Sequence, residues 1–205
     1  MENLIQYFEN IPSLHRSIIL VGGITLFWLI EGLVPTRKLA YKKWRHALPN
    51  FFFTATSILV NFFLAFLLLN TADWTQANGF GLLHIFALPL WLYVVLGVLL
   101  LDFIGAYLAH LVEHKIKPLW MVHLVHHSDH HVDTTTANRH HPLESLVRFS
   151  FTLVAVFILG TPIGVVMLYQ SLSVVLSQFN HANINLPTRL DQWLSYVLVT
   201  PHMHK

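Results

Sequence analysis

Apolar runs of membrane-spanning length, separated by short polar stretches, dominate the first third of this chain. Residues 18–34 form the first run, which ends at Pro35, and residues 51–69 form the second. A helix needs about 20 apolar residues to cross a bilayer. Both runs therefore predict transmembrane helices. Glu31 lies near the end of the first one, where we expect it at the level of the membrane interface.

Two further runs are less regular. Residues 82–114 are too long for one bilayer crossing, so we predict a single helix that spans the membrane and projects beyond it. Residues 149–176 are interrupted at 160–162 by Gly-Thr-Pro, and the two arms are short for full spans. This pattern favours a hairpin that enters the membrane and returns. The last stretch, residues 186–205, predicts a loop with a short amphipathic helix.

These runs predict an all-α integral membrane protein with about three transmembrane helices plus a re-entrant or short helical hairpin. We expect residues 1–96 to hold the N-terminal membrane spans and residues 97–205 to form a histidine-rich region, which includes the hairpin and a histidine-rich helical cap. Two basic clusters fix the orientation, because cytoplasmic loops are enriched in Lys and Arg. Both predict the cap on the cytoplasmic side, and they comprise Arg37, Lys38, Lys42, Lys43 and Arg45, then Lys115 and Lys117.

Composition supports a membrane protein and excludes several chemistries. The chain is 55% hydrophobic and only 11% charged, whereas soluble domains carry about 25% charged residues. It has no cysteine, which excludes disulfides, thiolate zinc sites and cysteine nucleophiles. A net charge of +2 is too small to indicate nucleic acid as a partner.

Histidines are concentrated in residues 109–131, which hold seven of the 15 in the chain. His110 and His114 are four apart, and His123 is followed by histidines at i+3 and i+4, so each group shares one helix face. Pro118 between the groups predicts two helices that meet at a break. Neutral imidazole binds iron, zinc, copper and nickel. The pattern therefore predicts a metal site without naming the metal.

Several motifs accompany the histidines, and together they resemble the fatty acid hydroxylase/sterol desaturase superfamily. The motifs are Leu-Leu-Leu-Asp-Phe at 99–103, the two histidine groups, His-Ser-Asp at 127–129, Thr-Ala-Asn-Arg-His-His-Pro-Leu-Glu at 136–144, Asn-His-Ala-Asn at 180–183 and Thr-Pro-His-Met-His-Lys at 200–205. The resemblance covers about the C-terminal half. It implies a membrane di-iron enzyme that uses O2 to hydroxylate or desaturate a lipid such as a fatty acid or a sterol, with zinc as a substitute in isolated protein.

The same resemblance implies the ligand set His110, His114, His123, His126, His127, His181 and His204. We expect Asp102 to accept a ring N–H from a ligand, and His141 to bond Glu144, as residues that orient the ligands. Glu113 points off the histidine face and should meet solvent. Arg139 and Glu144 are expected to form an ion pair, and His46 and His84 to be ordinary interface residues.

The family closes its ligand set with a third box, His-x-x-His-His, after a Thr-Pro pair. Thr200-Pro201 and His204 match the start of this box, and the sequence ends at Lys205. One alternative is therefore an inactive truncated fragment of the oxygenase, and another is a non-catalytic metal-binding membrane protein such as a transporter. No Gly-x-Gly-x-x-Gly motif and no cytochrome b5 signature is present, so electrons should come from a separate ferredoxin or cytochrome b5 type donor.

Overall fold

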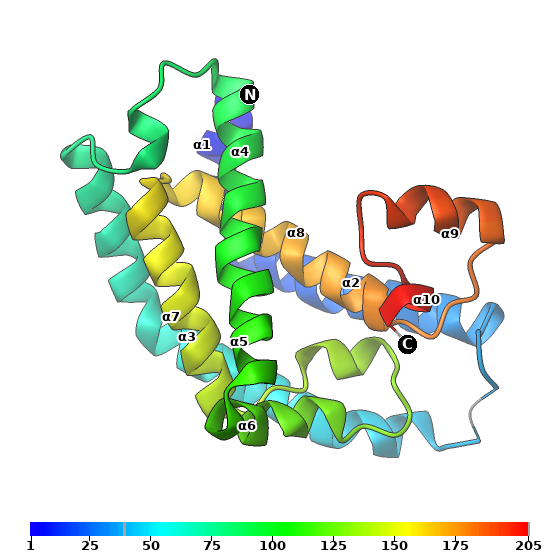
Figure 1. Cartoon of the computed structure of the whole chain (residues 1–205). Coiled ribbons are helices and arrows are strands. Elements are labelled where there is room, and N and C mark those ends of the chain that lie inside the picture. Colours follow the sequence, from blue (N-terminus) through cyan, green and yellow to red (C-terminus); the bar gives the residue numbers. More distant parts are fainter. Residues whose placement is uncertain (39, 205) are drawn as a thin grey trace.

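The computed structural model describes residues 1–38 and 40–204, and it is helical throughout (Figure 1). No β-strand occurs among these residues, and one isolated antiparallel bridge joins Pro35 to Ile184. Five helices are long and apolar enough to cross a membrane. The all-α membrane architecture predicted from the apolar runs is therefore confirmed at this level.

Three helices form the N-terminal part. α1 (Glu2–Glu9) is short, α2 (Ser13–Leu33) begins after Pro12, and α3 (Lys43–Ala77) runs for 35 residues. α3 is much longer than the predicted span of residues 51–69, because polar turns continue the helix at both ends. Its length lets one helix contact both α7 and the short η3 segment.

The next segment departs from the single helix predicted over residues 82–114. A 3-10 turn, η1 (Leu82–His84), comes first, and α4 (Leu90–Asp102) begins only after Pro89. A π-helical stretch, η2 (Phe103–Leu108), then leads into α5 (Ala109–Lys115). Because a π-helix takes more residues per turn, the helix face changes between Asp102 and His110.

Two short elements follow the predicted break near Pro118. α6 (Lys117–His127) starts after Ile116, whose backbone is extended, so the chain turns and brings α6 against α5. η3 (Thr134–Asn138) is held by a capping box in which the Asp133 side chain accepts a hydrogen bond from the Thr135 amide in the first turn. The predicted pair of helices meeting at a break is confirmed.

The hairpin predicted around residues 160–162 is present, with longer arms than expected. α7 (Pro142–Leu159) and α8 (Ile163–His181) have 18 and 19 residues, so each reaches spanning length. Gly160 between them has φ +68, and a Cβ there would collide with the Phe80 carbonyl, so the turn requires glycine. α9 (Thr188–Ser195) and α10 (Pro201–His204) end the described chain.

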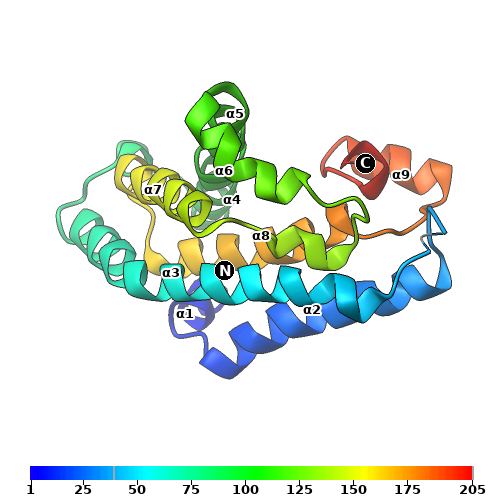
Figure 2. The ribbon, with the colours of Figure 1, turned by 90° about the horizontal axis from the view of Figure 1, so that it is seen from below.

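The core lies among α4, α7 and α8, where Leu101, Val156 and Val165 are fully or almost fully inaccessible. Seen from below, α8 lies above α2 and α3, and α5 and α6 lie at the far side from them (Figure 2). The C-terminal end of α8 carries α10 beside it. This arrangement brings α5, α6, the end of α8 and α10 to one region of the molecule.

Candidate metal centre

Four histidines from α5 and α6 converge on one point. The Nε2 atom of His114 lies 3.1 Å from that of His110 and 3.2 Å from that of His127. The Nε2 atoms of His127 and His123 are 3.1 Å apart. One nitrogen from each of the four rings lies within 4.8 Å of the others. We call this set the first histidine group.

A second histidine group comes from three separate elements: His126 on α6, His181 at the end of α8, and His204 on α10. The Nε2 atoms of His126 and His181 are 3.0 Å apart, and the ring centroids of His181 and His204 are 4.1 Å apart. His126 and His127 are neighbours in sequence, so their side chains leave α6 in different directions. α6 thereby supplies both groups, and all seven histidines of the predicted ligand set fall into one group or the other.

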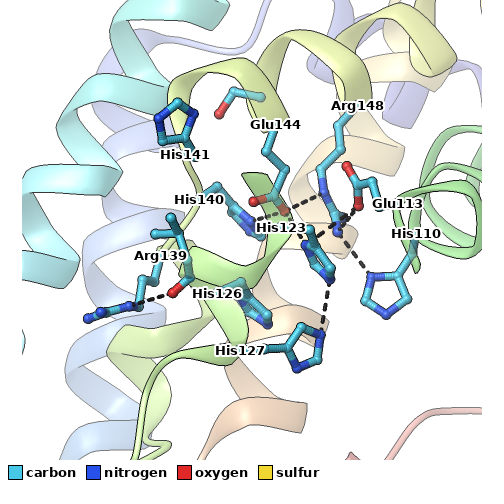
Figure 3. A network of polar contacts seen from close by, with 12 residues as sticks. His110, Glu113, His123, His126, His127, Arg139, His140, His141, Glu144 and Arg148 are labelled. Atoms are coloured by element: carbon cyan, nitrogen blue, oxygen red, sulfur yellow. Dashed lines mark hydrogen bonds and ion pairs between the residues drawn. The ribbon is translucent and has the colours of Figure 1, made fainter. Parts of the chain in front are cut away.

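A buried carboxylate lies behind the first group (Figure 3). Glu144 Oε1 accepts hydrogen bonds from His123 Nδ1 at 2.8 Å and from His140 Nδ1 at 2.7 Å. The side chain is 1% exposed. A ring whose Nδ1 carries the proton presents a lone pair on Nε2, and this is how a carboxylate orients a metal-binding histidine. Glu144 therefore directs His123 Nε2 toward the other three rings.

Arg148 joins this network from one turn further along α7. Its Nε donates to Glu144 Oε1 at 3.1 Å, and its Nη2 donates to Glu113 Oε2 at 2.8 Å. Nη2 also lies 3.1 Å from His110 Nδ1. The guanidinium pairs with two carboxylates that are each 1% exposed, which offsets part of the cost of burying them. Glu113 is thus buried, and the prediction that it meets solvent is wrong.

The second group is oriented by backbone. His181 Nδ1 donates to the Ser177 carbonyl at 2.7 Å, so its Nε2 is free to face His126.

Burial, and then the neighbouring histidines, lower the pKa of His126 well below its usual range. The same causes lower the pKa of His127 to about 4. These imidazoles are neutral near pH 7, which is the form that binds metals.

The donor set fits metal ions. Where two neutral rings meet through Nε2, one nitrogen must donate and the other accept, so the lone pairs of a whole group are best satisfied by a shared cation. His126 Nδ1 is buried and has no hydrogen-bond partner within the described residues, which leaves the ring without another anchor. An all-imidazole set suits iron, zinc, copper or nickel.

Three sequence-predicted contacts are placed differently. Asp102 is exposed, and no hydrogen bond to an imidazole is found for it in the described chain. His141 Nδ1 accepts from the Leu143 amide at the start of α7, and its neighbour His140 takes the contact with Glu144. Arg139 donates to Asn50 Oδ1 and to the Val125 carbonyl instead of pairing with Glu144.

Sequence reasoning also missed a polar network between the N-terminal helices and the histidines. Glu31 is 2% exposed, and its Oε1 accepts from the backbone amides of Thr134 at 2.7 Å and Asn183 at 2.8 Å. His46 on α3 lies 2.8 Å from Asp129 and 3.1 Å from Asp133. Both side chains thus link separate elements inside the protein, which the sequence did not predict. The signal available for Glu31 was a carboxylate within an apolar run, and His46 directly follows the basic stretch 42–45.

Comparison with known proteins gives two matches. A family model described as fatty acid hydroxylase matches residues 94–205. The ornithine lipid hydroxylase OlsE of Rhizobium tropici is 26% identical over 117 residues, which cover 57% of this chain and 34% of that protein. The chain thus spans about a third of the length of this curated relative. No solved structure matches it.

Proposed function

The chain belongs to the fatty acid hydroxylase family, and from this premise we propose that it is a membrane-bound, O2-dependent lipid hydroxylase with two iron ions. The resemblance drawn from the histidine motifs is thereby confirmed. The observation that carries the proposal is the convergence of ring nitrogens in two adjacent groups that share α6. Zinc is the metal we expect as a substitute in isolated protein.

The first iron would be held by His110, His114, His123 and His127, and the second by His126, His181 and His204. Iron, when bound, supplies the capacity to activate O2 for oxidation of an unactivated C–H bond. The protein supplies orientation. Glu144 holds the proton on His123 Nδ1, and the Ser177 carbonyl holds the proton on His181 Nδ1, so both Nε2 lone pairs point inward.

The surrounding elements determine the charge next to the histidines and the route by which a lipid can reach them. Arg148 forms ion pairs with both Glu113 and Glu144, so one guanidinium offsets part of the charge of the two buried carboxylates. The apolar helices that lead to the histidines exclude water and border the lipid phase, so an acyl chain can approach laterally. We place the centre on the cytoplasmic side, because both basic clusters lie at this end of the spans.

The substrate class is a membrane lipid, and an ornithine lipid is the first one to test because of the relative's activity. The experiment is metal analysis of purified protein combined with lipid mass spectrometry under 18O2. We expect two irons per chain and a product that gains one 18O atom. Haem absorbance, or a product without the isotope, would contradict the oxygenase. Bound metal with no oxidised lipid would favour a non-catalytic metal-binding protein or an inactive fragment.

A further inference from the structure

Four exposed cations lie on the chain between α2 and α3 and at the start of α3. They are Arg37, Lys38, Lys42 and Arg45, which we call the basic patch. We propose that the basic patch is the docking site of a small acidic electron-transfer protein, of the iron–sulfur or haem class, that reduces the metal centre. This inference rests on the proposed function, because only a redox centre needs such a partner.

The patch carries an uncompensated positive charge. Residues 37–45 contain five of the 12 Lys and Arg residues of the chain. Lys43 is paired with Glu31, whereas within the described residues no hydrogen bond or ion pair ends on the other four side chains. The nearby side chains of Asp129 and Asp133 are only 3% and 0% exposed, and both carboxylates already accept hydrogen bonds. An acidic surface is the complement that would be attracted here.

The patch also adjoins the histidines. Arg37 lines a hollow of about 180 Å³ together with His126, His127 and His204. This hollow joins the second histidine group to the surface of the basic patch. A donor seated on the patch would therefore place its own redox centre next to a ligand-bearing part of the chain. A cation cluster that only anchored the protein to lipid headgroups would have no need to adjoin the ligands.

A set of partly buried hydrogen bonds fixes the patch relative to the histidines. The Asn183 side chain accepts from the Arg37 amide at 3.1 Å and donates to the Arg37 carbonyl at 2.7 Å. Asn183 follows the ligand candidate His181 by two residues. The Tyr41 hydroxyl donates to Asp133 at 2.6 Å, which ties the middle of the segment to η3. A preorganised surface loses less entropy when a partner binds.

The electron balance requires such a partner. Hydroxylation of a C–H bond by O2 gives an alcohol and one water, and it consumes two electrons and two protons beyond those of the substrate. The chain has no cysteine for an iron–sulfur cluster and no glycine-rich dinucleotide motif. Each docking event oxidises the donor by one electron and reduces the metal centre by one, so two events support one turnover.

The test measures binding directly, independent of turnover. The protein is placed in nanodiscs of neutral phosphatidylcholine, and the probes are a plant-type [2Fe–2S] ferredoxin and a soluble cytochrome b5 domain, followed by biolayer interferometry. One variant replaces all four patch residues by Gln. The matched control carries four Gln substitutions at exposed cations elsewhere, namely Arg16, Lys115, Lys117 and Arg189. Both variants lose the same charge.

We expect at least one probe to bind the wild type and to lose about tenfold in affinity with the patch variant, while the control changes by less than about twofold. Binding should weaken as salt shortens the range of the charges. Equal losses in both variants would overturn the proposal, since only total charge would matter. Unchanged probe binding with weaker retention on phosphatidylglycerol vesicles would also overturn it and assign the patch to lipid.

A reductant arm separates this proposal from the proposed function. With dithionite as the electron source, the patch variant should form lipid product like the wild type, because docking is bypassed. If neither protein forms product or holds iron, the hydroxylase itself fails. If both form product and the probes bind both equally, only the docking site fails.

Discussion

The two histidine groups are built in different ways. The first takes all its rings from α5 and α6, within residues 110–127, and a carboxylate–guanidinium network supports it from behind. The second takes rings from α6, α8 and α10, which are separated by up to 78 residues in sequence, and a backbone carbonyl orients His181. One group is local and side-chain supported, and the other depends on the tertiary fold.

The two histidine groups therefore depend on different parts of the fold. The first group requires the turn at Ile116 and the approach of α7. The second requires the end of α8 to bring His181 to His126. The Gly160 turn and the contacts of Glu31 with Thr134 and Asn183 secure this position. Damage to the N-terminal helices should therefore reach the second group before the first.

The largest expected effect comes from removing one ring of each group in turn. His123→Ala should reduce the iron content from two per chain to one and abolish lipid product, because His123 lies at the centre of the first group. His181→Ala should also leave one iron, with the first group retained. Iron is counted by plasma mass spectrometry, and the remaining ion is identified by Mössbauer spectroscopy.

The metal contents of these two variants test whether each histidine group binds its own ion. Loss of all metal in both would mean that the groups form one interdependent site. Metal content unchanged in His181→Ala would remove the second group from the centre. Ser150→Ala, an exposed position on α7, serves as the control for handling and purification.

The next largest effect is expected from Glu144, the carboxylate that orients His123. Glu144→Gln keeps the shape of the side chain and removes the charge that accepts from His123 Nδ1. Loss of such an orienting partner weakens metal binding by about 10- to 100-fold. We expect the loss at the first group only, seen as one accelerated phase when iron is released to a chelator. Two equally accelerated phases would indicate general destabilisation instead.

The sequence could predict the local group and much less of its support. Helical spacing places His110 over His114 and His123 over His127, so periodicity predicts the two pairs of rings from which the first group is built. His181 and His204 were named from a family resemblance, because spacing says nothing about rings that far apart. The predicted partners of the supporting side chains were wrong where the contact depends on the tertiary fold. Glu113 was assigned to solvent because the approach of Arg148 from α7 cannot be seen on one helix.

The membrane-spanning helices were likewise predicted only in part from the sequence. Apolar runs located the helices, yet they missed the polar turns that extend α3 to Lys43 and the π-helical stretch that turns Asp102 away. A π-helix has no strong sequence signature, so the face of a residue beyond it is unpredictable. Gly160 was found correctly because a Gly-Thr-Pro interruption in an apolar run is a local signal.

A smaller effect tests the link from the N-terminal helices to the second group. Glu31→Gln should destabilise the protein by roughly 1–3 kcal/mol, because two buried amides then share a weaker acceptor. The melting temperature should fall, and iron should leave the second group faster than the first. Lys43→Gln is the control. It removes only the partly exposed contact at 3.4 Å and should cost less than about 1 kcal/mol.

The smallest effect concerns pH and the loop between the two groups. Burial alone would raise the pKa of Asp133, but hydrogen bonds from His46, Thr135 and Tyr41 lower it below its usual range. A carboxylate with a lower pKa in the folded state stabilises the protein above its unfolded pKa of about 3.9, and this contribution is lost as the pH falls below that value. Asp133→Asn should therefore cost about 1 kcal/mol at pH 7 and less at about pH 3. Thermal unfolding of both proteins in detergent measures the two differences, and an equal cost at both values would show that shape, not charge, holds this loop.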